Sequence, residues 1–227
     1  MLKRNITSSD VVGAIQRGIL SAQSDYKRSA EDWISNAPEY LCTVRVYNSI
    51  LRKLKTIDKL SGSASGFITL ECPSTYIGTI IKRGPKTRNS LTKHSRVDLF
   101  LWGASGAPRA VIEMKRNFRN SQGIENDIER IRQFLLYCHP KPVFGVFSTI
   151  VYKDVGRTKT IEETTDFVWA EIEQVKGLVE NSVVDLSCSP HYIEPKVLNV
   201  IDDNGKSHTR LWCPLCFTLR RSRISNR

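Results

Sequence analysis

Apolar and polar positions at the start of the chain follow the spacing of helices. Residues 8–10, Ser-Ser-Asp, are good N-cap residues, and apolar residues then recur every three or four positions through 11–20. A second helical pattern runs from Pro38, a favoured residue for the first turn of a helix, to Leu54. The flexible small-residue segment 61–66 follows. We therefore expect two helices before the first strand.

Shorter apolar runs rich in β-branched residues come next. The runs at 67–70, 76–81, 97–102 and 110–114 are typical of strands. The last two runs are joined by 103–108, Gly-Ala-Ser-Gly-Ala-Pro, which is rich in turn-forming residues. A hairpin is therefore expected there.

The second half of the chain returns to helical spacing before further strands. Residues 123–137 place apolar side chains on one helical face, and 143–151 form a nearly continuous apolar run expected for a buried central strand. Another helix is expected over 161–179. A strand pair is expected around the Asp-Asn-Gly turn at 203–205, before a basic tail.

This order of elements predicts an α/β fold with a mixed central sheet flanked by helices. We expect one main domain over 37–227, which includes the C-terminal strand pair and the basic tail. Residues 1–36 are expected to form a helical extension to it. The chain is long enough for one sizeable core.

The charge balance of the chain indicates a possible class of binding partner. The chain carries 34 Lys and Arg against 23 Asp and Glu, a formal net charge of +11. Such an excess favours polyanions, because displacing counterions from a phosphate backbone drives association. A merely cationic, soluble surface remains the alternative reading.

Other features of the composition bear on the compartment. No secretion signal and no apolar run of about 18 residues is apparent, so we expect no membrane span. The six cysteines are then expected to be reduced thiols, several of them buried, in a cytoplasmic protein.

The residues that suggest chemistry are Asp98, Glu113 and Lys115. Asp98 lies in one predicted strand, and Glu113 and Lys115, being two apart, point to the same face of the next strand. Their neighbours are apolar, so charge at this place is costly unless something pairs with it or coordinates it. Two carboxylates and a backbone carbonyl, here that of Met114, are the hard oxygen ligands that magnesium prefers.

A bound cation of this kind would polarise a phosphate and lower the pKa of a water molecule. Lys115 has three possible roles beside it. The side chain can orient that water, act as a base if its pKa is lowered, or neutralise charge on the transition state. These three roles stay open.

Asp98 followed by Glu113-Met114-Lys115 resembles the PD-(D/E)XK, or restriction-endonuclease-like, nuclease superfamily, with Val97 in place of the proline. The resemblance covers about residues 38–151, in the family's core order of helix, strands, hairpin, helix and strand. It implies a Mg²⁺-dependent phosphodiester hydrolase, with Mn²⁺ as a substitute and Asp98, Glu113 and the Met114 carbonyl as ligands. DNA is the implied substrate.

The resemblance also implies supporting residues. An additional acid on the helix before the sheet matches Glu39, with Glu71 as the substitute. The RecB-type group carries Gln-x-x-x-Tyr on the helix after the lysine, and Gln133 and Tyr137 match it on one helical face. Glu39 can instead be a favourable first-turn charge, and Tyr137 a core residue with a solvated hydroxyl.

Basic residues around the predicted site are candidates for contacts with the phosphate backbone, which position a substrate without reading its sequence. Singly, each is more simply a solvated charge. The candidates before Asp98 are Lys82, Arg83, Lys86, Arg88 and Lys93, and those after Lys115 are Arg116 and Arg119.

Two alternatives compete with the nuclease. A structural Zn²⁺ held by Cys188, His191, Cys213 and Cys216 would indicate an adaptor or binding module, although the cysteines also fit an apolar strand. A non-catalytic nucleic-acid-binding protein on a nuclease-like fold is the second, since a fold does not determine a function. The chain has no Walker-type loop, so a nuclease would work alone, as a homodimer, or within a larger defence or repair complex.

Overall fold

The computed structural model describes residues 5–30, 39–73, 82–83, 96–116, 121–156, 159–183, 185–201 and 207–222. Its elements in chain order are α1 (Ser8–Ala30), α2 (Glu39–Ser61), β1 (Gly66–Pro73), β2 (Lys82–Arg83), β3 (Arg96–Gly103), β4 (Pro108–Lys115), α4 (Ser121–Tyr137), β5 (Cys138–His139), β6 (Phe144–Asp154), α5 (Ile161–Ser182), β7 (Leu186–Tyr192), β8 (Lys196–Ile201) and β9 (Ser207–Arg221).

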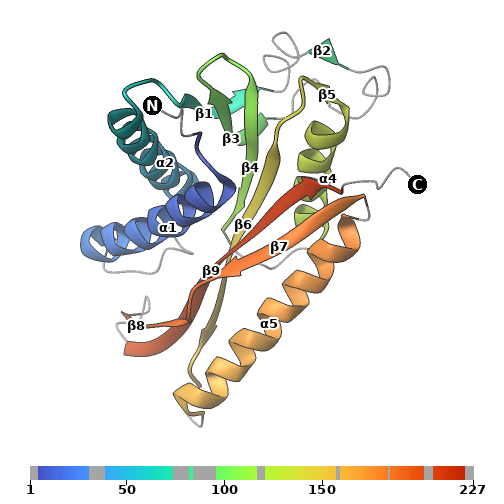
Figure 1. The fold of residues 1–227 in the computed structure, drawn as a ribbon. Coiled ribbons are helices and arrows are strands. Elements are labelled where there is room, and N and C mark those ends of the chain that lie inside the picture. The colour runs from blue at the N-terminus through green and yellow to red at the C-terminus, as the bar shows by residue number, and fades with distance from the viewer. Residues whose placement is uncertain are drawn as a thin grey trace.

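One mixed, open sheet organises the molecule (Figure 1). Its strands lie in the order β1-β3-β4-β6-β9-β7, and β8 also pairs with β9. Strands β1, β3 and β4 form an antiparallel meander, whereas β4 and β6 are parallel. The parallel pair needs a crossover, which α4 supplies. β2 and β5 form a small separate ladder.

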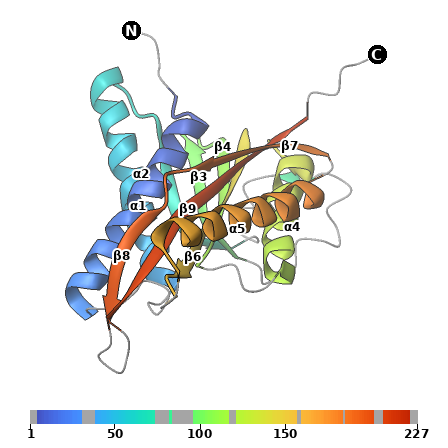
Figure 2. The same cartoon turned by 90° about the horizontal axis from the view of Figure 1, so that it is seen from below.

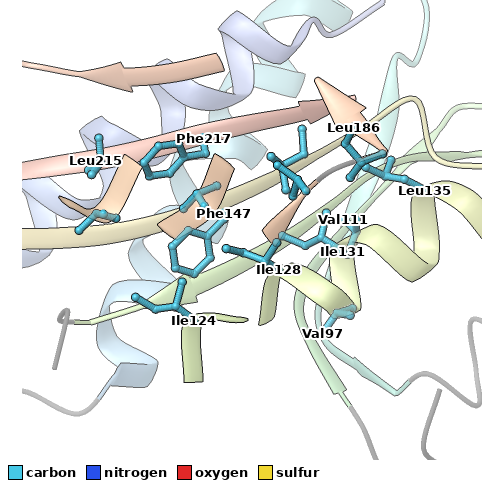
Figure 3. Packing of buried hydrophobic residues seen from close by; sticks show 14 of the residues in the cluster. Val97, Val111, Ile124, Ile128, Ile131, Leu135, Phe147, Leu186, Leu215 and Phe217 are labelled. Carbon is cyan, nitrogen blue, oxygen red and sulfur yellow. The ribbon is translucent and has the colours of Figure 1, made fainter. Parts of the chain in front are cut away.

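Helices cover both faces of the sheet (Figure 2). Helices α1 and α2 pack on one face, in a core that includes Leu99, Ile112 and Val146. Helices α4 and α5 pack on the other, where α4 places its apolar side chains against Val111 and Phe147 (Figure 3). Alternate residues of β4 therefore belong to different cores, as the period of a strand requires.

Two glycines allow elements to approach closely. A Cβ atom at Gly18 of α1 would lie 2.6 Å from the Val46 Cα atom of α2. A Cβ atom at Gly145 of β6 would lie 2.1 Å from Cγ2 of Ile131 in α4. Larger residues at either place would push a helix away from its neighbour.

The structure confirms the predicted α/β class, with a mixed, open sheet flanked by helices. The helices and strands predicted within the described residues are present, among them the strand pair β8 and β9, whereas the predicted turn residues 203–205 lie outside the described residues. The sequence analysis missed β7, in which Pro190 and alternating polar residues hide the strand pattern. The predicted strand at 76–81 lies outside the described residues.

The N-terminal segment contributes to the main core. Helix α1, within the predicted extension 1–36, packs along α2 and buries Val11, Ile15 and Ile19 in the same cluster as α2 and the sheet. Among the described helices, none is long and apolar enough to cross a membrane.

Candidate functional site

The β3–β4 pairing brings Asp98 and Glu113 together. Leu99 lies opposite Ile112 in this ladder, so the next step of the register places Asp98 beside Glu113. The Met114 backbone N–H donates a 2.7 Å hydrogen bond to Asp98 Oδ2. The Glu113 side chain is buried, with only 1% of the residue exposed. Two acidic groups, the half-buried Asp98 and the buried Glu113, therefore lie side by side near the ends of β3 and β4.

Both carboxyl groups hold their protons more tightly than usual. Burial raises the pKa of Asp98, and the hydrogen bond from Met114 lowers it in part. The pKa of Glu113 is raised well above its usual value, first by burial and then by the charge of Asp98. A side-chain hydrogen bond with Glu113 also acts on Asp98 and favours its charged form. Burial and the proximity of the two acids therefore both disfavour the state in which Asp98 and Glu113 are charged together.

Helix α4 supplies the charged partners of this pair. Arg130 Nη1 lies 2.7 Å from Glu113 Oε1 and 3.4 Å from Asp127 Oδ1. Lys115 Nζ lies 3.4 Å from Asp127 Oδ2. Asp127 is itself buried, so it links the lysine to the arginine in a setting of low solvation.

Sequence reasoning missed Asp127 and Arg130. The available signal was a charged residue, Asp127, between the apolar positions Ile124, Ile128 and Ile131 of an amphipathic helix. Only the packing of α4 across β4 shows that this face reaches Glu113 and Lys115.

Glu39 approaches the pair from the opposite layer. It is the first residue of α2, and its charge raises the pKa of Asp98 and that of the Cys42 thiol. Arg116, which follows Lys115, is half-buried and acts on the same thiol in the opposite direction. Four acids, Asp98, Glu113, Asp127 and Glu39, are thus brought around the strand ends from both helical layers.

The substitute acid Glu71 lies on the other neighbour of β3. Leu70 and Cys72 flank it opposite Leu99 and Val97, so Glu71 stands opposite Asp98 in the β1–β3 ladder. Its side chain is exposed and pairs with Arg96 at 3.1 Å. Its backbone has a positive φ of 46°, which is uncommon outside glycine.

The remaining family-type residues are placed less centrally. Gln133 is buried, and its Nε2 donates a 3.0 Å hydrogen bond to Glu129 Oε1 on the same helix. Tyr137 is half-buried at the end of α4. Within the described part of the chain, neither side chain hydrogen-bonds with Asp98 or Glu113. Their predicted role near a bound strand stays a prediction.

Most of the basic residues predicted to contact phosphate lie outside the part of the chain that the structure describes. Lys86, Arg88, Lys93 and Arg119 lie in segments that the structure does not describe, and only the backbones of Lys82 and Arg83 are placed, in β2. Of the predicted phosphate contacts, Arg116 alone is described with its side chain.

The four proposed zinc ligands are spread across β7 and β9. Cys213 and Cys216 are three apart in β9, which turns them to opposite faces, and they belong to different cores. The Cys213 thiol donates to the Ile193 carbonyl at 3.0 Å, and Cys216 Sγ lies 3.4 Å from Ser148 Oγ. Burial raises the pKa of each of these thiols to about 12.

All six cysteines are free thiols. Over the described ranges, no three or more His, Cys, Asp or Glu side chains form a ready-made group for a metal ion. A cation at Asp98 and Glu113 would therefore depend on two carboxylates completed by a backbone carbonyl and water, as the sequence analysis predicts, and not on a closed cage.

Comparisons with protein-family models, curated proteins and solved structures found no match to this chain. A functional assignment therefore depends on its own residues and their geometry.

Proposed function

We propose that this protein is a metal-dependent nuclease that hydrolyses phosphodiester bonds, with DNA as its substrate. The observation that carries the proposal is the pairing of Asp98 and Glu113 on adjacent strands, with Lys115 two residues beyond Glu113. Strongly perturbed pKa values cluster at functional sites, and here the raised pKa values belong to a half-buried and a buried acid on adjacent strands.

The order of elements supports the same proposal. Helix α2 precedes the antiparallel strands β1, β3 and β4, and α4 then crosses over to β6, which is parallel to β4. This order is the core order of the PD-(D/E)XK nucleases that the motif resembles. The motif residues lie on β3 and β4, in the meander of that core.

The charge balance of the site fits a divalent cation. Asp98, Glu113 and Asp127 are three acids in mutual electrostatic contact, and Arg130 and Lys115 are the cations paired with them. Glu39 adds a fourth negative charge. Burial is the first cause of the raised pKa values of Asp98 and Glu113, and the charges of neighbouring acids add to it. Carboxylate oxygens are the donors that Mg²⁺ and Mn²⁺ accept.

In the proposed site, Asp98, Glu113 and the Met114 carbonyl would hold the cation. The cation would supply Lewis acidity toward a phosphate oxygen and a lowered pKa for its bound water. Asp127 positions Lys115 through the 3.4 Å ion pair, so that its ammonium group is held beside the carboxylates. Lys115 would then orient the attacking water or neutralise charge on the phosphate. Glu39 would act as the auxiliary acid from α2.

The substrate class follows from charge. The net charge of +11 favours a polyanion, and Arg116 lies next to Lys115 in the chain, where it can reach a phosphate near the cleavage point. DNA is the choice that the family resemblance favours.

The proposal is tested by cleavage of supercoiled plasmid and of single-stranded DNA with Mg²⁺ or Mn²⁺. We expect cleavage by the wild-type protein, none with a chelator, and a loss of at least 10²-fold in Lys115→Ala, because an oriented charge at the transition state is removed. Lys141→Ala, at an exposed lysine, is the matched control and should cleave normally.

If the wild-type protein binds DNA tightly but leaves both substrates intact with every metal ion tested, the proposed nuclease activity is contradicted. That outcome would favour the non-catalytic binding protein. Equal cleavage by wild type and Lys115→Ala would show that the catalytic site lies elsewhere in the protein.

A further inference from the structure

We propose that a basic groove between α1 and α2 binds the phosphodiester backbone of the nucleic-acid strand outside the cleavage site. The groove has a volume of about 230 Å³, several times the space of a water molecule. The α1–α2 groove is lined by cationic and hydroxyl side chains: Arg17, Ser21, Arg45, Ser49, Arg52, Lys53 and Thr56.

The spacing of the lining residues shows how the helices build the groove. On α2, the positions 45, 49, 52 and 56 are separated by three or four residues, so they form one stripe along the helix. On α1, Arg17 and Ser21 are four apart and face that stripe. The buried residues Val46, Ile50 and Leu54 lie on a different face of α2, in the core that α1, α2 and the sheet share. The groove is therefore on the outer surface of the helical layer.

Two of the cations are held in place by acids of α1. Lys53 Nζ lies 2.9 Å from Asp10 Oδ1, and Arg45 Nε lies 3.0 Å from Asp25 Oδ2. The other two, Arg17 and Arg52, are exposed and have no ion-pair partner in the described part of the chain. Four cations against two carboxylates leave an excess of two positive charges directed to one groove.

Arg45 provides a second, independent observation. Its Nε–H is buried and near Asp25, but the two groups are not aligned for a hydrogen bond. Charge attraction at 3.0 Å is thus present, while the donor capacity of this nitrogen is unused. A shift of the Arg45 side chain toward a phosphate in the groove would let this nitrogen donate a hydrogen bond that it lacks in the structure.

The ligand class follows from the shape and contents of the groove. Planar guanidinium groups bind phosphate oxygens with two parallel hydrogen bonds, and hydroxyl groups add neutral donors. Exposed large apolar side chains, which a protein partner would contact, are not among the lining residues. An elongated line of phosphates matches this stripe of donors better than a compact ion.

The groove and the proposed cleavage site share helix α2. Glu39, beside Asp98, begins α2, and Arg45 follows six residues later, or about 9 Å along a helix axis. Arg52 lies about 20 Å from that end by the same rise of 1.5 Å per residue. A strand leaving Asp98 and Glu113 along α2 would therefore present several successive phosphates to the groove. The groove proposal rests on the proposed nuclease function, and it adds the path that the substrate strand takes away from the cleavage site.

The test is binding of a fluorescent single-stranded oligonucleotide, measured by anisotropy in a chelator so that no cleavage occurs. We expect Arg17→Gln/Arg52→Gln to bind about tenfold or more weakly than wild type at low salt. The slope of log affinity against log salt should fall by about 1.4, because two fewer phosphates are neutralised. Arg17→Lys/Arg52→Lys should retain most of the affinity. Lys159→Gln/Lys196→Gln, which changes two exposed lysines outside the groove, is the control of equal charge.

If Arg17→Gln/Arg52→Gln binds the oligonucleotide as tightly as the control variant does, the groove proposal is overturned, because only overall charge would then affect affinity. The proposed nuclease function would remain intact. A wild-type protein that neither binds nor cleaves nucleic acid would overturn the proposed function and the groove together.

Discussion

Arg130 binds Glu113, a carboxylate that the proposed metal ion would also require. Its guanidinium donates to Glu113 at 2.7 Å and also lies 3.4 Å from Asp127. The side chain is one quarter exposed, so it is accessible to solvent as well as to Glu113. A cation bound by Glu113 would repel this guanidinium, which would then be available to a phosphate oxygen.

We therefore expect Arg130→Met to bind Mn²⁺ about tenfold or more tightly than wild type, because a competing positive charge is removed. Without metal, the variant should be less stable by about 3 kcal/mol, since Glu113 loses its buried partner. Isothermal titration and thermal unfolding with and without Mn²⁺ measure the two effects.

Arg132→Met is the matched control for this prediction. Arg132, also on α4, pairs with Glu129 of the same helix and with Asp185 before β7, and among the described residues it forms no ion pair with Glu113. Unchanged or weaker Mn²⁺ binding in Arg130→Met would show that Arg130 serves only as a structural ion-pair partner.

The raised pKa of Glu113 makes stability depend on pH. The folded protein holds this proton more tightly than the unfolded chain, whose carboxyl pKa is near the usual 4.5. The resulting stabilisation is fully present below that value and is lost as pH rises through the raised pKa. Asp98 acts in the same direction.

We expect Glu113→Gln to flatten this dependence. In a chelator, its free energy of unfolding should fall less than that of wild type between pH 4.5 and 8, because the amide carries no charge to bury. Chemical denaturation at several pH values measures this difference. Parallel pH curves for the two proteins would show that Glu113 is not the titrating group.

At the scale of elements, the candidate site depends on how closely α4 lies against β6. The absence of a side chain at Gly145 lets Ile131 pack onto the strand, and Ile131 follows Arg130 directly in α4. The positions of Asp127 and Arg130 are thus set by a contact on the apolar side of the same helix.

We expect Gly145→Ala to destabilise the fold by about 1–3 kcal/mol, because the new methyl group would meet Ile131 Cγ2 at 2.1 Å. Adding Ile131→Ala should recover part of the loss, since the clashing group is removed. Gly177→Ala in α5, where an added Cβ meets nothing within 4 Å, is the control and should be neutral or stabilising. If the losses of stability in Gly145→Ala and Ile131→Ala simply add in the double variant, the clash is not the cause of the destabilisation.

At the scale of the whole molecule, local periodicity predicted the four described helices and six of the nine described strands, and it missed β2, β5 and β7. It also predicted the β3–β4 hairpin that pairs Asp98 with Glu113, because both depend on neighbours along the chain. The involvement of Asp127 and Arg130 could not be predicted in the same way, since it results from the packing of α4 across β4. The α1–α2 groove was missed for a similar reason: Arg17 and Arg52 are far apart in sequence and meet only when the helices pair.

The long strand β9 has a consequence for how this protein emerges during translation. All three motif residues and their α4 partners are synthesised by Asp154, but the open edge of β6 is covered only by β9, at 207–221. A ribosome-bound nascent chain would meanwhile display an unpaired apolar strand edge, which is prone to pair with other chains. We therefore expect the nascent chain to be most exposed to intermolecular strand pairing between the synthesis of β6 and that of β9.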